Sequence, residues 1–367
     1  MSIYSHRRAA FQQVLRSFDL DVFVVSHPPN VRYLTGYVGS NGVCVIGTHG
    51  ALVLTDSRYS VSAREQVDTE VDVVIGPGDL TAHIAKAVIE LAASGRVGLE
   101  AAHVSMARGA QLSTSIRARD DAIEISSEVG RVEELRLVKD EGEIAAIQRA
   151  ADVADTALAT VLAEGIIGRT ERDVAFALQT EFFRCGAEGP SFDTIVATGA
   201  NGAKPHAVPG DRVIGTGELV VIDLGAIVDG YCSDMTRTIA TGPLQDDLAN
   251  AYAVCAQAQS AALAAVRPGL TCAALDAVAR DIIVSAGLGE AFGHGLGHGV
   301  GLEIHEAPRV SREGTETLRP GMVVTIEPGI YLEGRGGVRI EDLVVVTDDG
   351  SRTLSQSPKL AVNSVTV

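Results

Sequence analysis

The chain after residue 140 contains an internal repeat, which limits the available folds more than any other feature of the sequence. Each copy has a long helical pattern, a glycine, a threonine two residues later, and a second helical pattern that closes on a glycine. The copies are Glu141–Ala163 with Gly168, Thr170 and Gly186, and Asp247–Val266 with Gly269, Thr271 and Gly287. The two sets of marker residues lie 101 positions apart. Threonine suits a helix N-cap and glycine a left-handed C-terminal cap, so the repeat predicts two similar halves.

Each half continues with strand-like segments that carry acidic residues. The first half has Asp223 in VVIDLG and then Asp234, and the second has Glu327 in VTIEPG and then Glu341. Two helices and a strand pair in each half predict an α+β domain with pseudo-twofold symmetry. The carboxylates of both halves would then meet on the axis between them.

These four carboxylates, together with His298 in HGLGHGVGLEIH, form a ligand set suited to two divalent metal ions. Carboxylate-rich ligation selects Mn²⁺, Co²⁺, Fe²⁺ or Zn²⁺, and we expect Mn²⁺. Two such ions can hold a hydroxide, the nucleophile that amide hydrolysis needs. A lone acidic residue at a strand end more often caps a turn, but five candidates in duplicated contexts favour the metal site. The sequence therefore predicts a metallohydrolase.

Other polar residues lie close to these motifs. His206, His294 and His305 are in glycine-rich segments, and this clustering predicts a catalytic or substrate-orienting role. An imidazole near metal ions can donate to a developing oxyanion or shuttle a proton. Arg339 lies two residues before Glu341, so both would project to one face of a strand, where the arginine could orient a ligand carboxylate.

The first 128 residues alternate helix-like and strand-like patterns and predict a separate, smaller α/β domain, which divides the chain into 1–128 and 129–367. The expected strands are 22–25, 43–46, 51–55, 71–75, 96–100 and 122–126, and the expected helices are 7–18, 81–93 and 104–116. Segments 43–46 and 51–55 flank a short turn and predict a hairpin. The charged stretch 131–143 is expected to connect the domains as a surface helix. The histidines of the N-terminal part share no ligand-like spacing, and we expect no chemistry from them.

Composition excludes several classes of protein. A chain of 367 residues exceeds one ordinary core, which agrees with two domains. The formal charge of −17 argues against nucleic acid or an anionic membrane as partner. Five scattered cysteines without a Cys-x-x-Cys pair disfavour a disulfide framework and fit a reducing compartment. With no apolar signal core or membrane span in the sequence, we expect a cytoplasmic protein.

At these motifs the chain resembles the pita-bread metallopeptidases, which include Xaa-Pro dipeptidase (prolidase), aminopeptidase P and methionine aminopeptidase. The C-terminal part carries all five ligand positions, and NVRYLTGYVGSNG and LTDSRYS resemble the N-terminal domain of prolidases and creatinases. The resemblance implies a homodimer that uses two metal ions to hydrolyse the Xaa-Pro bond of dipeptides or short peptides. A separate N-terminal domain of this size disfavours methionine aminopeptidase.

The resemblance also implies the roles of the catalytic residues. The positions that match the dinuclear metal ligands are Asp223, Asp234, His298, Glu327 and Glu341. His305 matches the histidine that assists the tetrahedral intermediate, and His206 the one beside the scissile bond. Glu327 would also take part in proton transfer.

Substrate-binding roles are implied in the same way. His294 matches a further pocket histidine, and Arg339 the arginine that precedes the last ligand. Arg309 in HEAPRVS matches an arginine that meets the free carboxylate of a dipeptide, with a surface ion pair as the open alternative. Tyr231 and Tyr331 are weaker candidates for the pocket wall, with core packing as the alternative.

Two other functions compete with the peptidase. A creatinase-like amidino hydrolase has the same fold without metals, and a non-catalytic pita-bread protein would act as a binding module. Both would lack several of the five ligands, so the complete set disfavours them. Metal analysis of the purified protein would discriminate among the three.

Overall fold

The computed structural model describes residues 2–92 and 95–359. They fall into two compact units, Met1–Arg136 and Leu137–Val367. Residues 129–136, which the sequence analysis assigned to the second domain, lie in the first unit. The reason is that Asn30 donates to Glu133 and accepts from Arg136, each at 2.6 Å.

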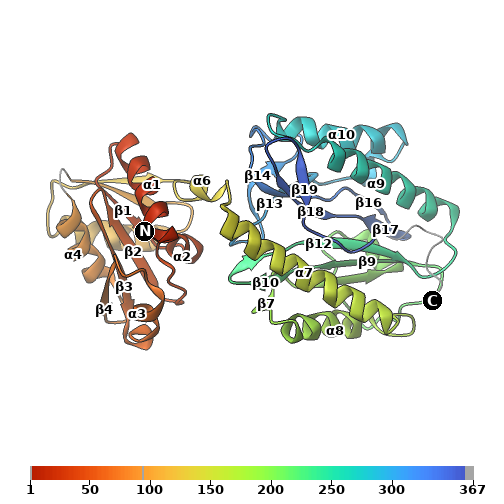
Figure 1. The fold of residues 1–367 in the computed structure, drawn as a ribbon, viewed down its shortest axis with the longest axis horizontal. Coiled ribbons are helices and arrows are strands. Elements are labelled where there is room, and N and C mark those ends of the chain that lie inside the picture. Colours follow the sequence, from red (N-terminus) through yellow and green to blue (C-terminus); the bar gives the residue numbers. More distant parts are fainter. Residues whose placement is uncertain (1, 93–94, 360–367) are drawn as a thin grey trace. The chain divides into compact units, whose positions relative to one another are not determined.

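A six-stranded mixed sheet forms the first unit (Figure 1), in the order β4-β3-β2-β1-β5-β6. Its strands are β1 Val22–Val25, β2 Gly42–Gly47, β3 Gly50–Asp56, β4 Asp72–Gly76, β5 Arg96–Glu100 and β6 Glu124–Glu128. Its helices are α1 Ile3–Ser17, α2 Pro28–Thr35, α3 Ser62–Gln66, α4 Thr81–Leu91 and α5 Met106–Arg117, with a 3-10 turn at Ser57–Tyr59. All six expected strands are present, and β2 and β3 form the expected antiparallel hairpin.

Two helices of this unit were not expected from the sequence, α2 and α3. Prolines occupy the first positions of α2, where a missing N–H costs nothing, so a start signal was present in the sequence. The expected helix 81–93 ends at Leu91 in the structure, and its residue 93 lies outside the described residues.

The connecting stretch 131–143 is not one surface helix, and that prediction was wrong. A short helix, α6 (Glu133–Arg136), ends before the long helix α7 (Glu141–Ala163) begins. Asp140 starts α7 with a capping box to Glu143, which requires a non-helical backbone at the cap. Arg136 and Lys139 are buried rather than exposed, and Lys139 pairs with Glu306 at 3.0 Å.

The second unit has a helix pair in each half, α7 with α8 (Glu171–Arg184) and α9 (Asp246–Ala265) with α10 (Cys272–Ser285). In Figure 1 the first pair lies along one side of this unit and the second pair along the opposite side, with the strands between them. The strands are β7 Gly189–Pro190, β8 Ile195–Thr198, β9 Leu219–Leu224, β10 Ala226–Val228, β11 Tyr231–Cys232, β12 Met235–Ala240, β13 Gly297–Gly299, β14 Glu306–Val310, β15 Val323–Ile326, β16 Gly329–Leu332, β17 Gly336–Arg339, β18 Asp342–Val346 and β19 Ser351–Thr353.

Each helix pair covers its own strands. Apolar residues of α7 and α8 pack against β9 and β12, and those of α9 and α10 pack against β15 and β18. The sheets are β12-β9-β8, β14-β13-β15-β18-β19, β11-β10-β7 and β16-β17. Short 3-10 turns lie at Gly199–Ala203 and Gly289–Ala291.

Backbone contacts confirm the internal duplication. The Glu171 N–H donates to Arg212 O at 3.0 Å, and the Cys272 N–H donates to Glu316 O at 2.9 Å, at matching places in the two halves. The paired caps also match: Thr170 and Thr271 cap α8 and α10, and Gly186 and Gly287 follow these helices at φ +87° and +76°. The predicted α+β domain with its internal duplication, preceded in the sequence by a smaller α/β domain, is therefore confirmed. No helix within the described residues is long and apolar enough to span a membrane.

Candidate metal centre and substrate cavity

A cavity of about 970 Å³ in the second unit gathers most of the predicted site residues. They are His206, Asp223, Asp234, His294, His298, His305, Arg309, Glu327, Arg339 and Glu341. Tyr331 and apolar side chains such as Phe192 and Ile195 also line it. A concave site with apolar walls and convergent polar groups is typical of small-substrate binding.

Strand pairing brings the acidic residues together. In the first half, Thr236 of β12 lies opposite Asp223 of β9, so Asp234 reaches the same edge. In the second half, Glu327 follows β15 and Glu341 precedes β18, two strands that pair antiparallel. β13, which carries His298, pairs with β15. Strand pairing thus brings together Asp223 and Asp234 in the first half and His298, Glu327 and Glu341 in the second.

The distances among these residues suit a metal site. One ligand atom from each of Asp234, His298 and Glu341 lies within 4.8 Å of the other two. His298 Nε2 is 3.2 Å from Glu327 Oε1 and 3.5 Å from Asp234 Oδ2. Asp223 Oδ1 and Glu341 Oε1 are buried and accept no hydrogen bond from the residues that the structure describes. A buried carboxylate oxygen without a donor is costly, so both atoms are suited to a cation.

Electrostatics at the cluster point the same way. Burial, then the charges of Glu341 and Asp223, raise the pKa of Asp234 well above its usual value. Burial, then Glu327 and Asp223, likewise raise the pKa of Glu341. Carboxylates that repel one another in a buried site are stabilised by a bound cation, which reverses this effect.

Glu327 and His298 behave as a hydrogen-bonded pair. Burial acts to raise the pKa of Glu327, but the His298 hydrogen bond and the positive charges of His298 and Arg339 together outweigh it and lower that pKa to about 2. Burial acts to lower the pKa of His298, but the same bond, the negative charge of Glu327 and the hydrogen bond to Gly299 together raise it above its usual value. Metal binding would require the neutral imidazole, so a cation would replace this proton.

The orientation of His298 is determined by its neighbours. Its Nδ1 lies 3.0 Å from Gly299 O, which directs Nε2 toward the carboxylates. The His298 N–H donates to Thr325 Oγ1 at 3.0 Å, and that hydroxyl donates to Glu327 Oε1 at 2.9 Å. A Cβ on Gly297 would lie 2.0 Å from Thr325 O, so glycine is needed for this close approach.

Arg339 hydrogen-bonds both to the cluster of acidic residues and to the pocket wall. Its Nη2 donates to Asp223 Oδ2 at 2.7 Å, and its Nη1 donates to Tyr331 Oη at 2.8 Å. Burial acts to lower the pKa of Arg339, but Tyr331 and Asp223 hold it above its usual value. Tyr331 Oη also contacts His294 Nε2 at 3.0 Å, and burial raises the pKa of Tyr331 to about 12.

Two buried carboxylates on the second helices hold the histidine-bearing loops. Glu171 of α8 accepts from Thr198 N at 2.8 Å, from Asn201 Nδ2 at 2.9 Å and from Gly210 N at 3.0 Å, which closes both ends of the loop that carries His206.

The equivalent helix α10 does the same for His294. Asp276 accepts from Leu296 N at 3.0 Å and pairs with Arg280, which donates to His294 O at 2.7 Å. Each half therefore anchors its histidine loop to its own second helix.

Comparison with known proteins identifies the family. The model of metallopeptidase family M24 matches residues 145–348. The chain belongs to metallopeptidase family M24. The model of the creatinase/prolidase N-terminal domain matches residues 7–138.

Relatives of this M24 chain cover nearly its whole length. A Xaa-Pro dipeptidase of Pyrococcus furiosus is 36% identical, over 93% of this chain and 94% of its own. The structure is similar to that of a Xaa-Pro dipeptidase from Bacillus anthracis, with a TM-score of 0.92, 37% identity, and coverage of 98% and 99% of the two chains. It is also similar to an X-Pro aminopeptidase from Thermotoga maritima, with a TM-score of 0.86, 35% identity, and coverage of 95% and 99%.

Membership of M24 implies divalent metal ions, and the residues present fit them. The donor-free oxygens of Asp223 and Glu341 and the proximity of Asp234, His298 and Glu341 are the observations that support this fit. Hard oxygen donors with one imidazole are the ligands that such ions prefer.

The structure corrects one predicted site residue of this M24 chain. Tyr231 lies outside the group of described residues that line the cavity. It is buried among the apolar residues between α7 and β18, and its Oη donates to Glu143 at 3.0 Å. A tyrosine close in sequence to a ligand can still lie on the opposite side of its strand, because neighbouring strand positions alternate faces.

Three further residues of the site had little or no signal in the sequence. Tyr331 was only a weak candidate, and Thr236 and Thr325 were not singled out. Thr236 Oγ1 donates to Glu341 Oε2 at 2.7 Å, and Thr325 bridges His298 and Glu327. The spacing of two residues between Thr325 on β15 and Glu327 directly after it was the signal that could have revealed that threonine.

Proposed function

We propose that this M24 chain is a metal-dependent Xaa-Pro dipeptidase that hydrolyses the bond before proline in dipeptides or short peptides. The observation that carries the proposal is the convergence of carboxylates from both halves, with two donor-free oxygens, beside three cavity histidines. The relatives named Xaa-Pro dipeptidase, at 36% and 37% identity over almost the full chain, support this substrate class.

The five residues proposed as ligands of two divalent metal ions are Asp223, Asp234, His298, Glu327 and Glu341. We propose Mn²⁺ as the metal, with Co²⁺, Zn²⁺ or Fe²⁺ as alternatives of the same ligand preference. When bound, such ions supply polarisation of the scissile carbonyl and activation of a water at neutral pH. Arg339 would keep Asp223 oriented for this task through its 2.7 Å hydrogen bond.

The remaining polar groups would handle the substrate and its protons. Burial lowers the pKa of His294, and burial together with the positive charge of His298 lowers that of His305. Both imidazoles are then neutral near pH 7 and able to donate one proton and accept another. We assign His305 to the developing oxyanion, His206 and His294 to the pocket, and Glu327 to proton transfer from the water that would attack the bond.

Proline sets a steric and hydrogen-bonding condition on the pocket. The nitrogen of the Xaa-Pro bond belongs to the proline ring and carries no hydrogen. An enzyme that requires an N–H donor at this position therefore cannot bind the bond. The cavity offers apolar surface from Phe192 and Ile195 to such a ring.

Arg309 is the proposed clamp for the free carboxylate of a dipeptide. It is exposed on β14, lies opposite His298 in the strand register and lines the cavity. Within residues 2–92 and 95–359, its guanidinium forms no ion pair, which disfavours the alternative of a surface pair. An exposed, uncommitted guanidinium can bind a carboxylate through two parallel hydrogen bonds.

One experiment tests this function against its rivals. Purified protein, stripped of metal and reloaded with Mn²⁺, is assayed with Ala-Pro, Ala-Pro-Ala and Met-Ala-Ser. Hydrolysis of Ala-Pro that depends on Mn²⁺ supports the dipeptidase, and a preference for Ala-Pro-Ala would indicate an aminopeptidase. A protein that holds no stoichiometric metal and hydrolyses none of them would support a binding module or a creatinase-like hydrolase.

Assembly and location complete the proposal. We propose a homodimer in the cytoplasm, which light scattering and cell fractionation would test. The five cysteines are all unpaired in the structure, in agreement with a reducing compartment.

A further inference from the structure

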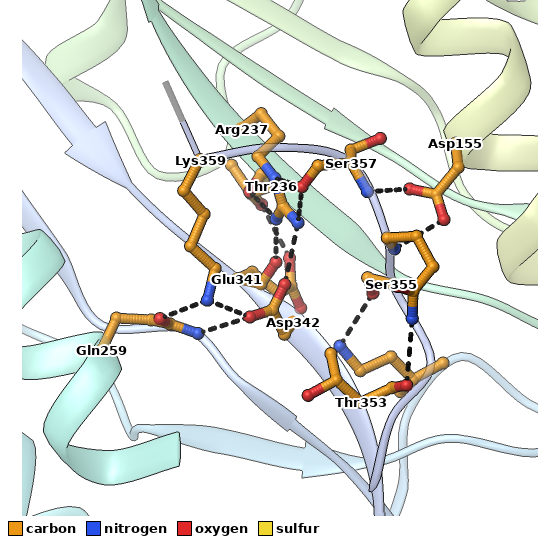
Figure 2. A network of polar contacts seen from close by, with 12 residues as sticks. Asp155, Thr236, Arg237, Gln259, Glu341, Asp342, Thr353, Ser355, Ser357 and Lys359 are labelled. Carbon is orange, nitrogen blue, oxygen red and sulfur yellow. Dashed lines mark hydrogen bonds and ion pairs between the residues drawn. The ribbon is translucent and has the colours of Figure 1, made fainter. Parts of the chain in front are cut away.

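The described C-terminal segment, residues 355–359, returns to the second unit directly behind Glu341. Figure 2 shows the polar network that holds it. We propose that this segment, named here the C-terminal strap, is a positioning element for the metal site. The inference rests on the proposed metal-ligand role of Glu341. Ser355 of the strap accepts from the Leu343 N–H at 3.0 Å and Lys359 pairs with the Asp342 side chain, and none of the strap residues lines the cavity.

Arg237 of β12 is the central group of the network. Its side chain is 2% exposed and lies between the strap and the corner at Glu341 and Asp342. Toward the strap, Nε and Nη2 donate to Ser357 O at 3.0 and 2.7 Å. Toward the corner, Nη2 donates to Asp342 Oδ1 at 2.8 Å and Nη1 donates to Glu341 O.

Arg237 also holds Thr236, the residue that donates a hydrogen bond to the Glu341 side chain. Its Nη1 donates to Thr236 O at 3.0 Å, and the hydroxyl of Thr236 donates to Glu341 Oε2. One guanidinium thus holds the carbonyls of both residues whose side chains meet at the cavity. A displaced guanidinium would leave Thr236 and Glu341 joined by their own two hydrogen bonds alone.

The strap supplies the carbonyl acceptor that the buried guanidinium needs and a lysine that pairs with Asp342. Two N–H groups of the guanidinium have Ser357 O as partner, and a buried charge left without partners is strongly unfavourable. Lys359 pairs with Asp342 Oδ2 and donates to Gln259 Oε1 at 2.8 Å, while Gln259 Nε2 donates to the same Asp342 oxygen at 2.9 Å. Asp342 is therefore held by Arg237 at Oδ1 and by Lys359 and Gln259 at Oδ2.

Asp155 of α7 anchors the strap from outside the metal site. Its two carboxylate oxygens accept from the N–H groups of Gln356 and Ser357, each at 2.7 Å. These two bonds place the carbonyl of Ser357 against Arg237. Asp155 itself does not contact Glu341, so a substitution there changes the metal site only through the strap.

The test uses the full-length protein with Asp155→Ala. We expect the dissociation constant for Mn²⁺, measured from the electron paramagnetic resonance signal of the free ion, to rise about tenfold, as for other residues that orient a ligand. At saturating Mn²⁺, kcat should stay within about twofold of wild type, because no cavity residue is changed. Amide hydrogen exchange of residues 341–346, measured on the metal-free protein, should become faster.

A matched control lies one turn earlier on the same helix. Asp152→Ala removes the same charge, but among the residues that the structure describes this exposed carboxylate accepts only from Gln148. We expect Mn²⁺ affinity and exchange at 341–346 to match wild type. Lys359→Met is a second variant of the strap, and we expect it to change both measurements in the same direction as Asp155→Ala.

Two failures are distinguishable. Unchanged exchange at 341–346 in both Asp155→Ala and Lys359→Met overturns the strap, whether or not metal binds. Equal loss of Mn²⁺ affinity in Asp155→Ala and Asp152→Ala also overturns it, because the effect would then be one of charge alone. If the wild-type protein binds no divalent metal, the proposed function is overturned. If the strap variants nevertheless exchange faster at residues 341–346, the positioning role of the strap still stands.

Discussion

Thr236 and Glu341 form two hydrogen bonds with each other although 104 residues lie between them. The Glu341 N–H donates to Thr236 O at 3.1 Å, and the Thr236 hydroxyl donates to Glu341 Oε2 at 2.7 Å. Thr236 belongs to the first half of the duplicated domain and Glu341 to the second. This pair is therefore where the two halves are joined at the metal cluster.

Replacing Thr236 with valine should weaken metal binding. Valine has the same shape as threonine but no hydroxyl. Glu341 Oε2, which accepts from that hydroxyl, therefore loses its donor. We expect the Mn²⁺ dissociation constant to rise about tenfold and the free energy of unfolding to fall by about 1–3 kcal/mol. Calorimetric titration and urea unfolding measure these effects. Thr236→Ser, which keeps the hydroxyl, should recover most of the affinity, and failure to do so would contradict this role.

Removing one buried carboxylate should stabilise the metal-free protein while abolishing metal binding. Burial and neighbouring charges raise the pKa of Asp234 in the folded state, so the folded protein binds more protons than the unfolded one above pH 4. Stability then falls as pH rises from there toward the folded pKa. In Asp234→Asn this loss is absent, and we expect metal-free stability at pH 7 to exceed that of wild type.

The same variant has a pH signature. The difference in urea-unfolding free energy between Asp234→Asn and wild type, both metal-free, should shrink as pH is lowered from 7 to 5. Asp281→Asn, at an exposed position on α10, is the control and should show no such trend. A difference that grows toward pH 5 would show that Asp234 is stabilised rather than strained by its surroundings.

Arg309→Ala should affect dipeptides more than tripeptides. Loss of a charge-assisted bond to a carboxylate costs about 1.5–3 kcal/mol, so KM for Ala-Pro should rise roughly 10- to 100-fold. For Ala-Pro-Ala, whose carboxylate lies one residue farther away, we expect less than a threefold change. Arg312→Ala, at an exposed residue nearby, is the control for surface charge. An equal rise in KM for both substrates would contradict the role of Arg309 as a carboxylate clamp.

Glu171→Gln should disturb the His206 loop without disturbing the metals. One oxygen of Glu171 serves both Asn201 and Gly210, and an amide cannot accept at both atoms. We expect kcat/KM for Ala-Pro to fall about tenfold, by the cost of one buried hydrogen bond, with Mn²⁺ affinity unchanged. Glu164→Gln, at the exposed end of α7, should behave as wild type. A parallel loss of Mn²⁺ affinity in Glu171→Gln would indicate a general defect of the fold.

Features with a local physical cause were predictable from the sequence. Thr170 and Thr271 cap helices because a side-chain oxygen satisfies nearby N–H groups, and Gly186 and Gly287 end them because glycine tolerates positive φ. These signals recur at one spacing, so they also predicted the duplicated domain. The strands of the first unit were predictable for the same reason, from their apolar runs.

The acidic residues and histidines of the site were predictable as a set, because residues that hold metals belong to few chemical types. Their partners were decided by the tertiary structure. Arg237 contacts Ser357 across 120 positions, and Tyr231 points away from the cavity while Tyr331 faces it. Threonine, tyrosine and arginine occur everywhere in proteins, so their sequence context carries a signal only where, as for Arg339, they stand at strand spacing from a ligand. Only the packing of β12 against the corner at Glu341 determines which of them reach the metal cluster.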